Sequence, residues 1–167
     1  MNQHPFDIIE LENGAKLLLT PCPGTKGASL ESSLLALKQA GTNMVITLMF
    51  DKDMQDNNIC GLPQLCKGNG IGWIQLPIVD DSIPCDIFES KWDKNLALIR
   101  DVLVQQGVIT IHCKGGYGRT GLVAGLILIS SGLTKEQAKN KVQEVRPNSL
   151  RNERQLAYFN AFSSSNL

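Results

Sequence analysis

The chain has 167 residues, of which 43% are hydrophobic and 19% are charged, as in ordinary globular proteins. This length suits one domain, so we expect a single domain over residues 1–167. Lys and Arg together number 16, as do Asp and Glu, and the net charge is zero. A nucleic-acid-binding protein usually carries a basic excess, so this balance argues against such a partner.

The sequence also shows no pattern typical of a membrane span, a secretory signal or a zinc site. The longest apolar run, residues 122–129, is too short to span a bilayer, which argues against a membrane partner. The opening MNQHPFDIIE has no basic region followed by an apolar block, so we expect no secretory signal. Five cysteines, an odd number, favour a reducing compartment and a cytoplasmic location. With two histidines and no Cys-x-x-Cys pair, a zinc site is not expected.

The first half of the chain alternates short apolar runs with helical patterns. FDIIEL and AKLLLT flank the turn signal ENG, which indicates a hairpin or two short strands over residues 6–20. Leucines with helical spacing predict a helix over residues 29–40. The next expected elements are a buried strand over 44–50, a polar loop over 51–57, a helix over 57–67 interrupted by glycine and proline, and a strand over 71–79.

The second half continues the alternation. Its expected elements are an amphipathic helix over 85–105, a strand over 108–112, a helix over 119–131, a capped helix over 134–145 and a last helix over 152–162. Strands that alternate with helices predict an α/β fold. We expect a three-layer sandwich whose mostly parallel central sheet is flanked by helices on both faces. Active sites of such sheets lie at the carboxyl ends of the strands.

The stretch HCKGGYGRTG, residues 112–121, stands at such a strand end. Backbone N–H groups of a glycine-rich turn before a helix point into one hollow, where the helix dipole favours an oxyanion. Arg119 would offer paired donors to two phosphate oxygens. Positive potential at a helix N-terminus also favours a thiolate, which would place Cys113 for attack on phosphorus. A turn that only binds phosphate is the plainer alternative, but it leaves the joint occurrence of Cys, Arg and Thr unexplained.

The same stretch resembles the signature of the cysteine-dependent protein tyrosine phosphatase superfamily: His-Cys, five residues, Arg, then Ser or Thr. LPIVDD, which ends 32 residues before the cysteine, resembles the family's mobile loop with the general acid. RPNSLRNERQLAYF resembles its C-terminal segment with a glutamine near the site. LLLTPCPG and the order of elements after it are similar to the kinase-associated phosphatase (cyclin-dependent kinase inhibitor 3-like) branch of the small dual-specificity phosphatases. The resemblance implies a phosphotyrosine phosphatase-like fold.

The resemblance also implies a role for each residue of the signature. Cys113 would be the nucleophile of a phosphocysteine intermediate, and Arg119 would clamp the phosphate and stabilise the transition state. Thr120 would donate a hydrogen bond to the thiolate. His112 would orient the loop and tune the thiol rather than act as a base. The residues expected to bind phosphate through backbone N–H groups, the lysine adding charge, are Lys114, Gly115, Gly116, Tyr117 and Gly118.

The general acid and the water-positioning residue lie outside the signature. The family uses an Asp on a separate loop to protonate the leaving group. Position relative to the preceding LPI favours Asp80, with Asp81 as the alternative, although acidic pairs are also common in solvated turns. Gln155 would position the hydrolytic water, unless it is a surface glutamine. Cys85 is a candidate partner of Cys113 in a protective disulfide on oxidation.

Three functions remain open at this point. The first is a phosphatase acting on phosphotyrosine, with phosphoserine and phosphothreonine as further targets, in proteins. The second acts on phosphoinositides or other non-protein phosphate monoesters, but those enzymes commonly carry a second Lys where this chain has Tyr117. The third is a non-catalytic phospho-binding module, which the presence of Cys113, Arg119 and Asp80 disfavours. We expect a monomer without metal or other cofactor, a phosphorylated protein as substrate, and, from the branch resemblance, a protein kinase as a partner.

Overall fold

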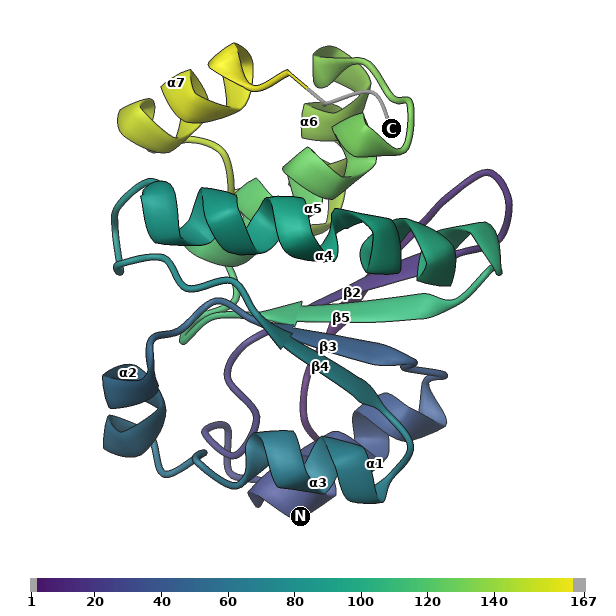
Figure 1. Ribbon diagram of the computed structural model, residues 1–167, viewed down its shortest axis with the longest axis vertical. Helices are drawn as coiled ribbons and strands as arrows, with labels where there is room; N and C mark the ends of the chain where they lie inside the picture. Colours follow the sequence, from purple (N-terminus) through teal and green to yellow (C-terminus); the bar gives the residue numbers. More distant parts are fainter. Residues whose placement is uncertain (1–2, 164–167) are drawn as a thin grey trace.

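The computed structural model describes residues 3–163 and places a five-stranded sheet between two layers of helices (Figure 1). The spatial order of the strands is β1-β2-β5-β3-β4. β1 pairs antiparallel with β2 and the other pairs are parallel, so the sheet is mixed and mostly parallel, as predicted. The strands are β1 (Asp7–Glu10), β2 (Lys16–Thr20), β3 (Met44–Thr47), β4 (Gly72–Gln75) and β5 (Val108–His112).

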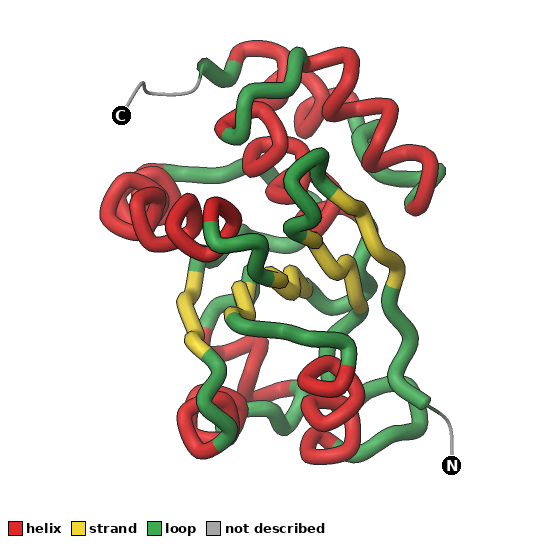
Figure 2. Tube along the Cα trace, turned by 90° about the vertical axis from the view of Figure 1, so that its right-hand side faces the viewer, coloured by secondary structure: helices red, strands yellow, loops and turns green. Residues whose placement is uncertain are grey.

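Helices cover both faces of the sheet, which confirms the predicted three-layer sandwich. α1, α2 and α3 lie on one side and α4 to α7 on the other, and the side view in Figure 2 shows the strands between the two layers. No helix within residues 3–163 is long and apolar enough to cross a bilayer. The helices are α1 (Leu30–Gln39), α2 (Asp51–Asp56), α3 (Leu62–Gly68), α4 (Asp86–Val104), α5 (Gly118–Ser130), α6 (Lys135–Val145) and α7 (Glu153–Ala161).

β5 lies in the middle of the sheet, and the signature begins at its carboxyl end. All residues of β5 are buried, since helices cover both faces, and its β-branched side chains suit such a strand. α5, which follows, is buried from Arg119 to Ser130. Its apolar character on nearly all sides is therefore explained by its place in the core. Strand and helix together hold the turn at 113–117 on a rigid support.

The polar segment 51–57, expected to be a loop, instead contains α2. The Asp53 carboxylate accepts a hydrogen bond from the backbone N–H of Phe50 at 3.3 Å and so caps the start of the helix. Met54 is buried and anchors the helix to the core. The expectation was wrong because one buried side chain in six residues leaves no helical period to detect.

The bounds of three other elements differ from those expected. α3 begins at Leu62 rather than at residue 57, and Pro63 stands in its first turn, where a missing N–H removes no helical bond. The strands expected over 44–50 and 71–79 end earlier, as β3 and β4. Hydrogen bonds nevertheless continue past them, from Leu48 N to His112 O at 3.0 Å and from Ile78 N to Leu48 O at 3.1 Å. The carboxyl ends of the three strands are thus tied together beside the turn.

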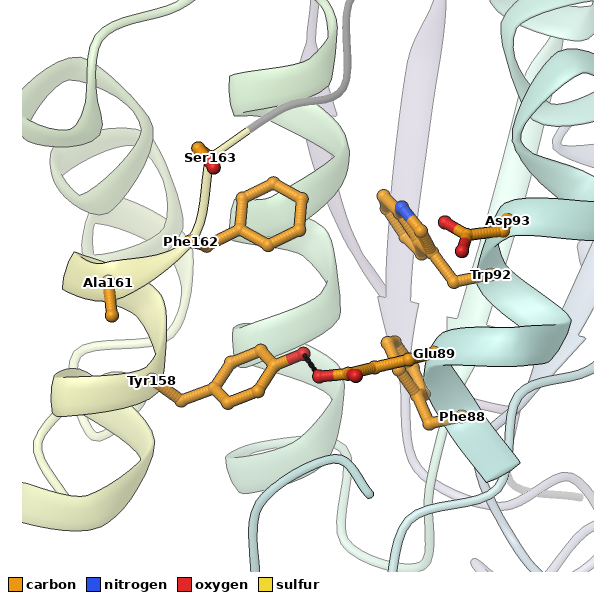
Figure 3. A pocket seen from close by; sticks show the side chains of 8 residues that line it. All are labelled: Phe88, Glu89, Trp92, Asp93, Tyr158, Ala161, Phe162 and Ser163. Carbon is orange, nitrogen blue, oxygen red and sulfur yellow. Dashed lines mark hydrogen bonds between the residues drawn. The ribbon is translucent and has the colours of Figure 1, made fainter. Parts of the chain in front are cut away.

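α7 and Phe162, which follows it, pack against α4 (Figure 3). Trp92 of α4 meets Phe162 edge-on with ring centres 5.9 Å apart, and Tyr158 of α7 donates a hydrogen bond to Glu89 at 3.1 Å. A cavity of about 410 Å³ lies among these side chains. These contacts join the two helices and include no residue of the turn at 113–117.

Candidate active site

The turn between β5 and α5 reaches its sharpest point at Gly116. Its φ of +82° lies in the left-handed region, and a Cβ atom there would stand 2.7 Å from the backbone N of Pro21 and from the carbonyl carbon of Thr20. Only glycine meets both demands, because it tolerates positive φ and lets the backbones approach. The backbone at the carboxyl end of β2 therefore packs directly against the turn at Gly116.

We expect Gly116→Ala to destabilise the fold by about 1–3 kcal/mol, because it combines backbone strain with a backbone clash. Urea unfolding measures this change. Gly115→Ala is the matched control, since its Cβ would meet nothing nearer than Cδ2 of Tyr117 at 3.7 Å. Equal unfolding free energies for the two variants would contradict the prediction.

Cys113 is 3% exposed and its sulfur receives two hydrogen bonds. The backbone N–H of Gly116 donates to Sγ at 3.2 Å, and the hydroxyl of Thr120 donates at 3.1 Å. Both donors come from the turn and first residues of α5, where the helix dipole also favours negative charge. Hydrogen bonds to a charged sulfur stabilise the thiolate. The sulfur thus occupies the environment that a nucleophilic cysteine requires.

Arg119 is buried, and its guanidinium contacts the two segments that follow β3 and β4. Nη1 donates to the carbonyls of Ile78 at 3.1 Å and Leu48 at 3.5 Å, and Nη2 pairs with the Asp80 carboxylate at 3.2 Å. Nε is buried and has no hydrogen-bond partner among residues 3–163. The two hydrogen bonds to carbonyls fix the plane of the guanidinium. Nε is available to an incoming oxyanion, and Nη2 can donate to that oxyanion in place of the Asp80 carboxylate.

Asp80 and Asp81 both line the cavity, but they face it differently. The Asp80 side chain is 68% exposed and pairs with Arg119, and it also accepts a hydrogen bond from the backbone N–H of Asp81 at 3.0 Å. Asp81 has a φ of +54°, so the chain turns at this residue. Of the two carboxylates, only that of Asp80 is paired with the guanidinium within residues 3–163.

Gln155 is buried, so the surface alternative for this glutamine is wrong. The Asn152 side chain caps α7 by accepting bonds from its first N–H groups, and this sets the helix start just before Gln155. The Gln155 amide donates to the carbonyl of Ser82 at 3.1 Å, and a Cβ at Gly118 would lie 3.5 Å from that amide. Gln155 therefore bridges the loop with Asp80 and the start of α5.

His112 is fully buried beneath the turn. Its Nε2 lies 2.8 Å from the hydroxyl of Thr47, and its Nδ1 lies 3.1 Å from the carbonyl of Cys113. Burial, which disfavours the charged imidazole, lowers the pKa of His112 to about 4. The ring is therefore neutral at neutral pH. This geometry agrees with an orienting residue, because the ring contacts the backbone of the turn.

One cavity of about 470 Å³ brings most of the expected site residues together. Three expected site residues do not line it: Gly116 lies in the turn itself, and His112 and Thr120 lie in β5 and α5 on either side of the turn. Thr25 and Lys26, which the sequence analysis did not single out, also line it. The expected site residues along the cavity are Asp80, Cys113, Lys114, Gly115, Tyr117, Gly118, Arg119 and Gln155.

Further residues that sequence reasoning missed support the turn from outside. The Arg146 guanidinium stacks 4.8 Å from the ring centre of Tyr117, and the Ser149 hydroxyl donates to the carbonyl of Tyr117 at 2.7 Å. The N–H of Cys22 donates to the carbonyl of Lys114 at 2.9 Å. The pKa of the Cys22 thiol is raised to about 12, mainly by burial and to a smaller extent by the nearby Cys113.

Cys85, expected as a redox partner of Cys113, is exposed and stands directly before α4. The disulfide between the two cysteines stays a prediction. Among residues 3–163, no group of three or more His, Cys, Asp or Glu side chains is placed to hold a metal ion.

A model of the family described as "Polymorphic toxin system, DSP-PTPase phosphatase" matches residues 23–133, which include Asp80 and the whole turn. The chain belongs to this DSP-PTPase family. It is a cysteine-dependent protein phosphatase of the tyrosine and dual-specificity class, as the signature indicated. The matched range ends before Gln155, so the family match does not extend to α7.

Two curated relatives agree with the DSP-PTPase assignment. A protein tyrosine phosphatase type IVA from Dictyostelium discoideum is 25% identical over 131 residues, which cover 71% of this chain and 78% of that protein. A tyrosine phosphatase of Invertebrate iridescent virus 6 is 40% identical over 57 residues, which cover 34% of this chain and 21% of the viral protein.

Solved structures confirm the phosphatase-like fold of this DSP-PTPase. Kinase-associated phosphatase, with serine at its catalytic cysteine, superposes with a TM-score of 0.82 at 20% identity, covering 95% of this chain and 93% of that one. A protein tyrosine phosphatase from Leishmania major gives 0.68 at 18% identity, covering 98% and 99%. The fold expected from the resemblance is therefore confirmed.

Proposed function

We propose that the chain hydrolyses phosphotyrosine in proteins, and phosphoserine and phosphothreonine as well, through a phosphocysteine intermediate on Cys113. One observation carries the proposal. The Cys113 sulfur accepts hydrogen bonds from Gly116 and Thr120 and lines the same cavity as Arg119. A thiolate, an amide-lined turn and a fixed guanidinium are the groups that phosphoryl transfer through sulfur needs.

In the first step, the thiolate of Cys113 attacks phosphorus, a sulfur–phosphorus bond forms, and the bond to the leaving oxygen breaks. Arg119 and the backbone N–H groups of residues 114–118 stabilise the charge on the phosphoryl oxygens, and Lys114 adds positive charge. Asp80 gives its proton to the leaving oxygen. Its place beside Arg119 supports this role, because the guanidinium holds the phosphoryl group that carries the leaving oxygen.

In the second step, water attacks phosphorus and the sulfur leaves as a thiolate. Asp80, now ionised, takes a proton from the water, and Gln155 orients it. The Thr120 hydroxyl stabilises the departing sulfur through the bond it already makes. His112 acts through the backbone of Cys113, to which it is bonded, and not as a base. The bond from Gln155 to Ser82 supports a shared position for the acid and the water.

We further propose a single domain that acts as a cytoplasmic monomer on phosphorylated proteins, among them a protein kinase. The likeness in fold to kinase-associated phosphatase supports the choice of a kinase. The balanced charge supports a protein rather than a membrane or nucleic acid as the partner. No metal or organic cofactor enters either step, because Arg119 and the turn supply the positive charge.

A substrate panel tests the proposed class. Purified protein is assayed for phosphate release from phosphotyrosine, phosphoserine and phosphothreonine peptides and from inositol phosphates, with the Cys113→Ser variant as the blank. We expect kcat/KM to be highest on phosphotyrosine peptides, lower but measurable on the other peptides, and at least about tenfold lower on inositol phosphates, a difference of about 1.4 kcal/mol. Preference for inositol phosphates would select the second function instead.

A further inference from the structure

A chain of hydrogen bonds crosses three parallel strands and ends at the nucleophile's backbone. It begins at Trp73 on β4, whose indole Nε1 lies 2.9 Å from the hydroxyl of Thr47 on β3. That hydroxyl lies 2.8 Å from Nε2 of His112, the last residue of β5. Nδ1 of His112 lies 3.1 Å from the carbonyl of Cys113. Thr47 and His112 are fully buried, and Trp73 is half-buried.

Chemistry fixes the direction of every bond in this chain. An indole N–H only donates and a carbonyl only accepts, so Trp73 donates to Thr47 and Nδ1 of His112 donates to Cys113. Because the His112 ring is neutral, its Nε2 then carries no hydrogen and must accept from the hydroxyl of Thr47. In the opposite tautomer, Nδ1 of His112 and the carbonyl oxygen of Cys113 would both be acceptors, and no hydrogen bond could form between them. We call this chain of hydrogen bonds, Trp73 to Thr47 to His112 to the Cys113 carbonyl, the relay; every bond in it is donated in the direction of Cys113.

The last bond sets the direction of a peptide plane in the turn. The carbonyl of Cys113 and the N–H of Lys114 belong to one trans peptide and point in opposite directions. His112 holds the Cys113 carbonyl on the side of the turn that faces the buried ring. The Lys114 N–H therefore points to the opposite side, where Lys114 lines the cavity. The next plane is held similarly, because Cys22 binds the Lys114 carbonyl and so aims the Gly115 N–H.

We propose that Trp73 is a positioning residue for phosphate binding, acting through Thr47 and His112 to aim the Lys114 N–H at the bound phosphate. The inference rests on the proposed function, since it assumes that the turn receives a phosphate. Trp73 contacts neither the cavity nor the nucleophile, and its indole N–H has no other partner within the described residues. Its one hydrogen bond therefore orders the hydroxyl on which the tautomer of His112 depends.

The first test is Trp73→Phe, which removes the donor and keeps an aromatic ring. We expect the inhibition constant for inorganic phosphate to rise about three- to tenfold, the effect of losing one neutral hydrogen bond, and kcat/KM on para-nitrophenyl phosphate to fall to match. Trp92→Phe is the matched control: it makes the same change in the α4 core, away from the relay, and should alter the phosphate constant less than twofold. An unchanged phosphate constant in folded Trp73→Phe overturns the proposal.

Variants of Thr47 test whether the residues act in series. Thr47→Val removes the hydroxyl without changing shape and should weaken phosphate binding at least as much as Trp73→Phe, whereas Thr47→Ser should restore it. The double variant Trp73→Phe, Thr47→Val should be no weaker than Thr47→Val alone, because one relay is broken once. If the fold-losses of phosphate affinity in the two single variants multiply in the double variant, Trp73 acts by packing alone, and the relay is overturned.

Nitrogen-15 NMR of the intact protein tests the relay even where a variant fails to fold. The chain has two histidines, and His4→Gln identifies the His112 signals. We expect His112 with a protonated Nδ1 and a bare Nε2, and Trp73→Phe or Thr47→Val should broaden or shift the Nε2 signal. A protonated Nε2 in the wild type contradicts the proposal. Phosphate binding without hydrolysis would overturn the proposed function but leave the relay intact.

Discussion

Replacing Cys113 by Ser is expected to lower kcat on para-nitrophenyl phosphate by about 10⁴-fold or more, the scale of losing a nucleophile. A serine hydroxyl is a much weaker nucleophile than a cysteine sulfur, although Gly116 and Thr120 would donate to the same position. Side-chain volume hardly changes at this buried site, so the fold and the turn should persist. Steady-state kinetics and a phosphate-binding titration measure the two properties separately.

The control for this experiment is Cys60→Ser, which changes an exposed cysteine between α2 and α3 and should leave kcat within twofold of wild type. Residual activity of Cys113→Ser within tenfold of wild type would exclude the phosphocysteine route. A wild type that binds phosphate as tightly as the variant and hydrolyses nothing would instead identify a phospho-binding module, the third function that the sequence left open.

Much of the fold was predictable because its signals are local. The capping box of α6, the apolar character of α5 and the buried run in β5 can each be recognised within a dozen or so residues. α2 escaped prediction because its six residues carry one buried side chain. Its helix is fixed by the cap at Asp53 and by packing of Met54, and packing is decided by distant parts of the chain.

The site divides in the same way. Contacts inside the signature, such as Thr120 with Cys113, were implied by the resemblance, because both residues belong to the same short motif. The carbonyls that fix Arg119 come from 71 and 41 residues away, and the Thr47 hydroxyl comes from 65 residues before His112. Only the parallel register of β3, β4 and β5 brings such groups together, and no single segment carries that register.

The choice between Asp80 and Asp81 as the general acid stays a prediction. Adjacent residues in a loop give no periodicity, so in the sequence only the position relative to the preceding LPI favoured Asp80 over Asp81. The positive φ of Asp81 turns the chain at that residue, and only Asp80 is paired with Arg119 within the described chain. A variant pair at these two positions therefore forms its own matched control.

Asp80→Asn is expected to lower kcat on para-nitrophenyl phosphate by about 10²-fold, because an amide cannot protonate the leaving oxygen. Asp81→Asn should keep the rate within about twofold of wild type. The reverse result would assign the acid to Asp81.

The leaving group sharpens the Asp80 experiment. Nitrophenolate departs easily without a proton, whereas phenolate depends on one, so the ratio of wild-type to Asp80→Asn rates should grow from para-nitrophenyl phosphate to phenyl phosphate. Phosphate affinity should not fall, because Asp80 competes with the ligand for Nη2 of Arg119 and its charge repels the anion. A rate loss that is equal for both substrates, or that comes with weaker phosphate binding, would mean that Asp80 only orders Arg119. A growing ratio with unchanged or tighter phosphate binding requires a proton from Asp80 in the transition state.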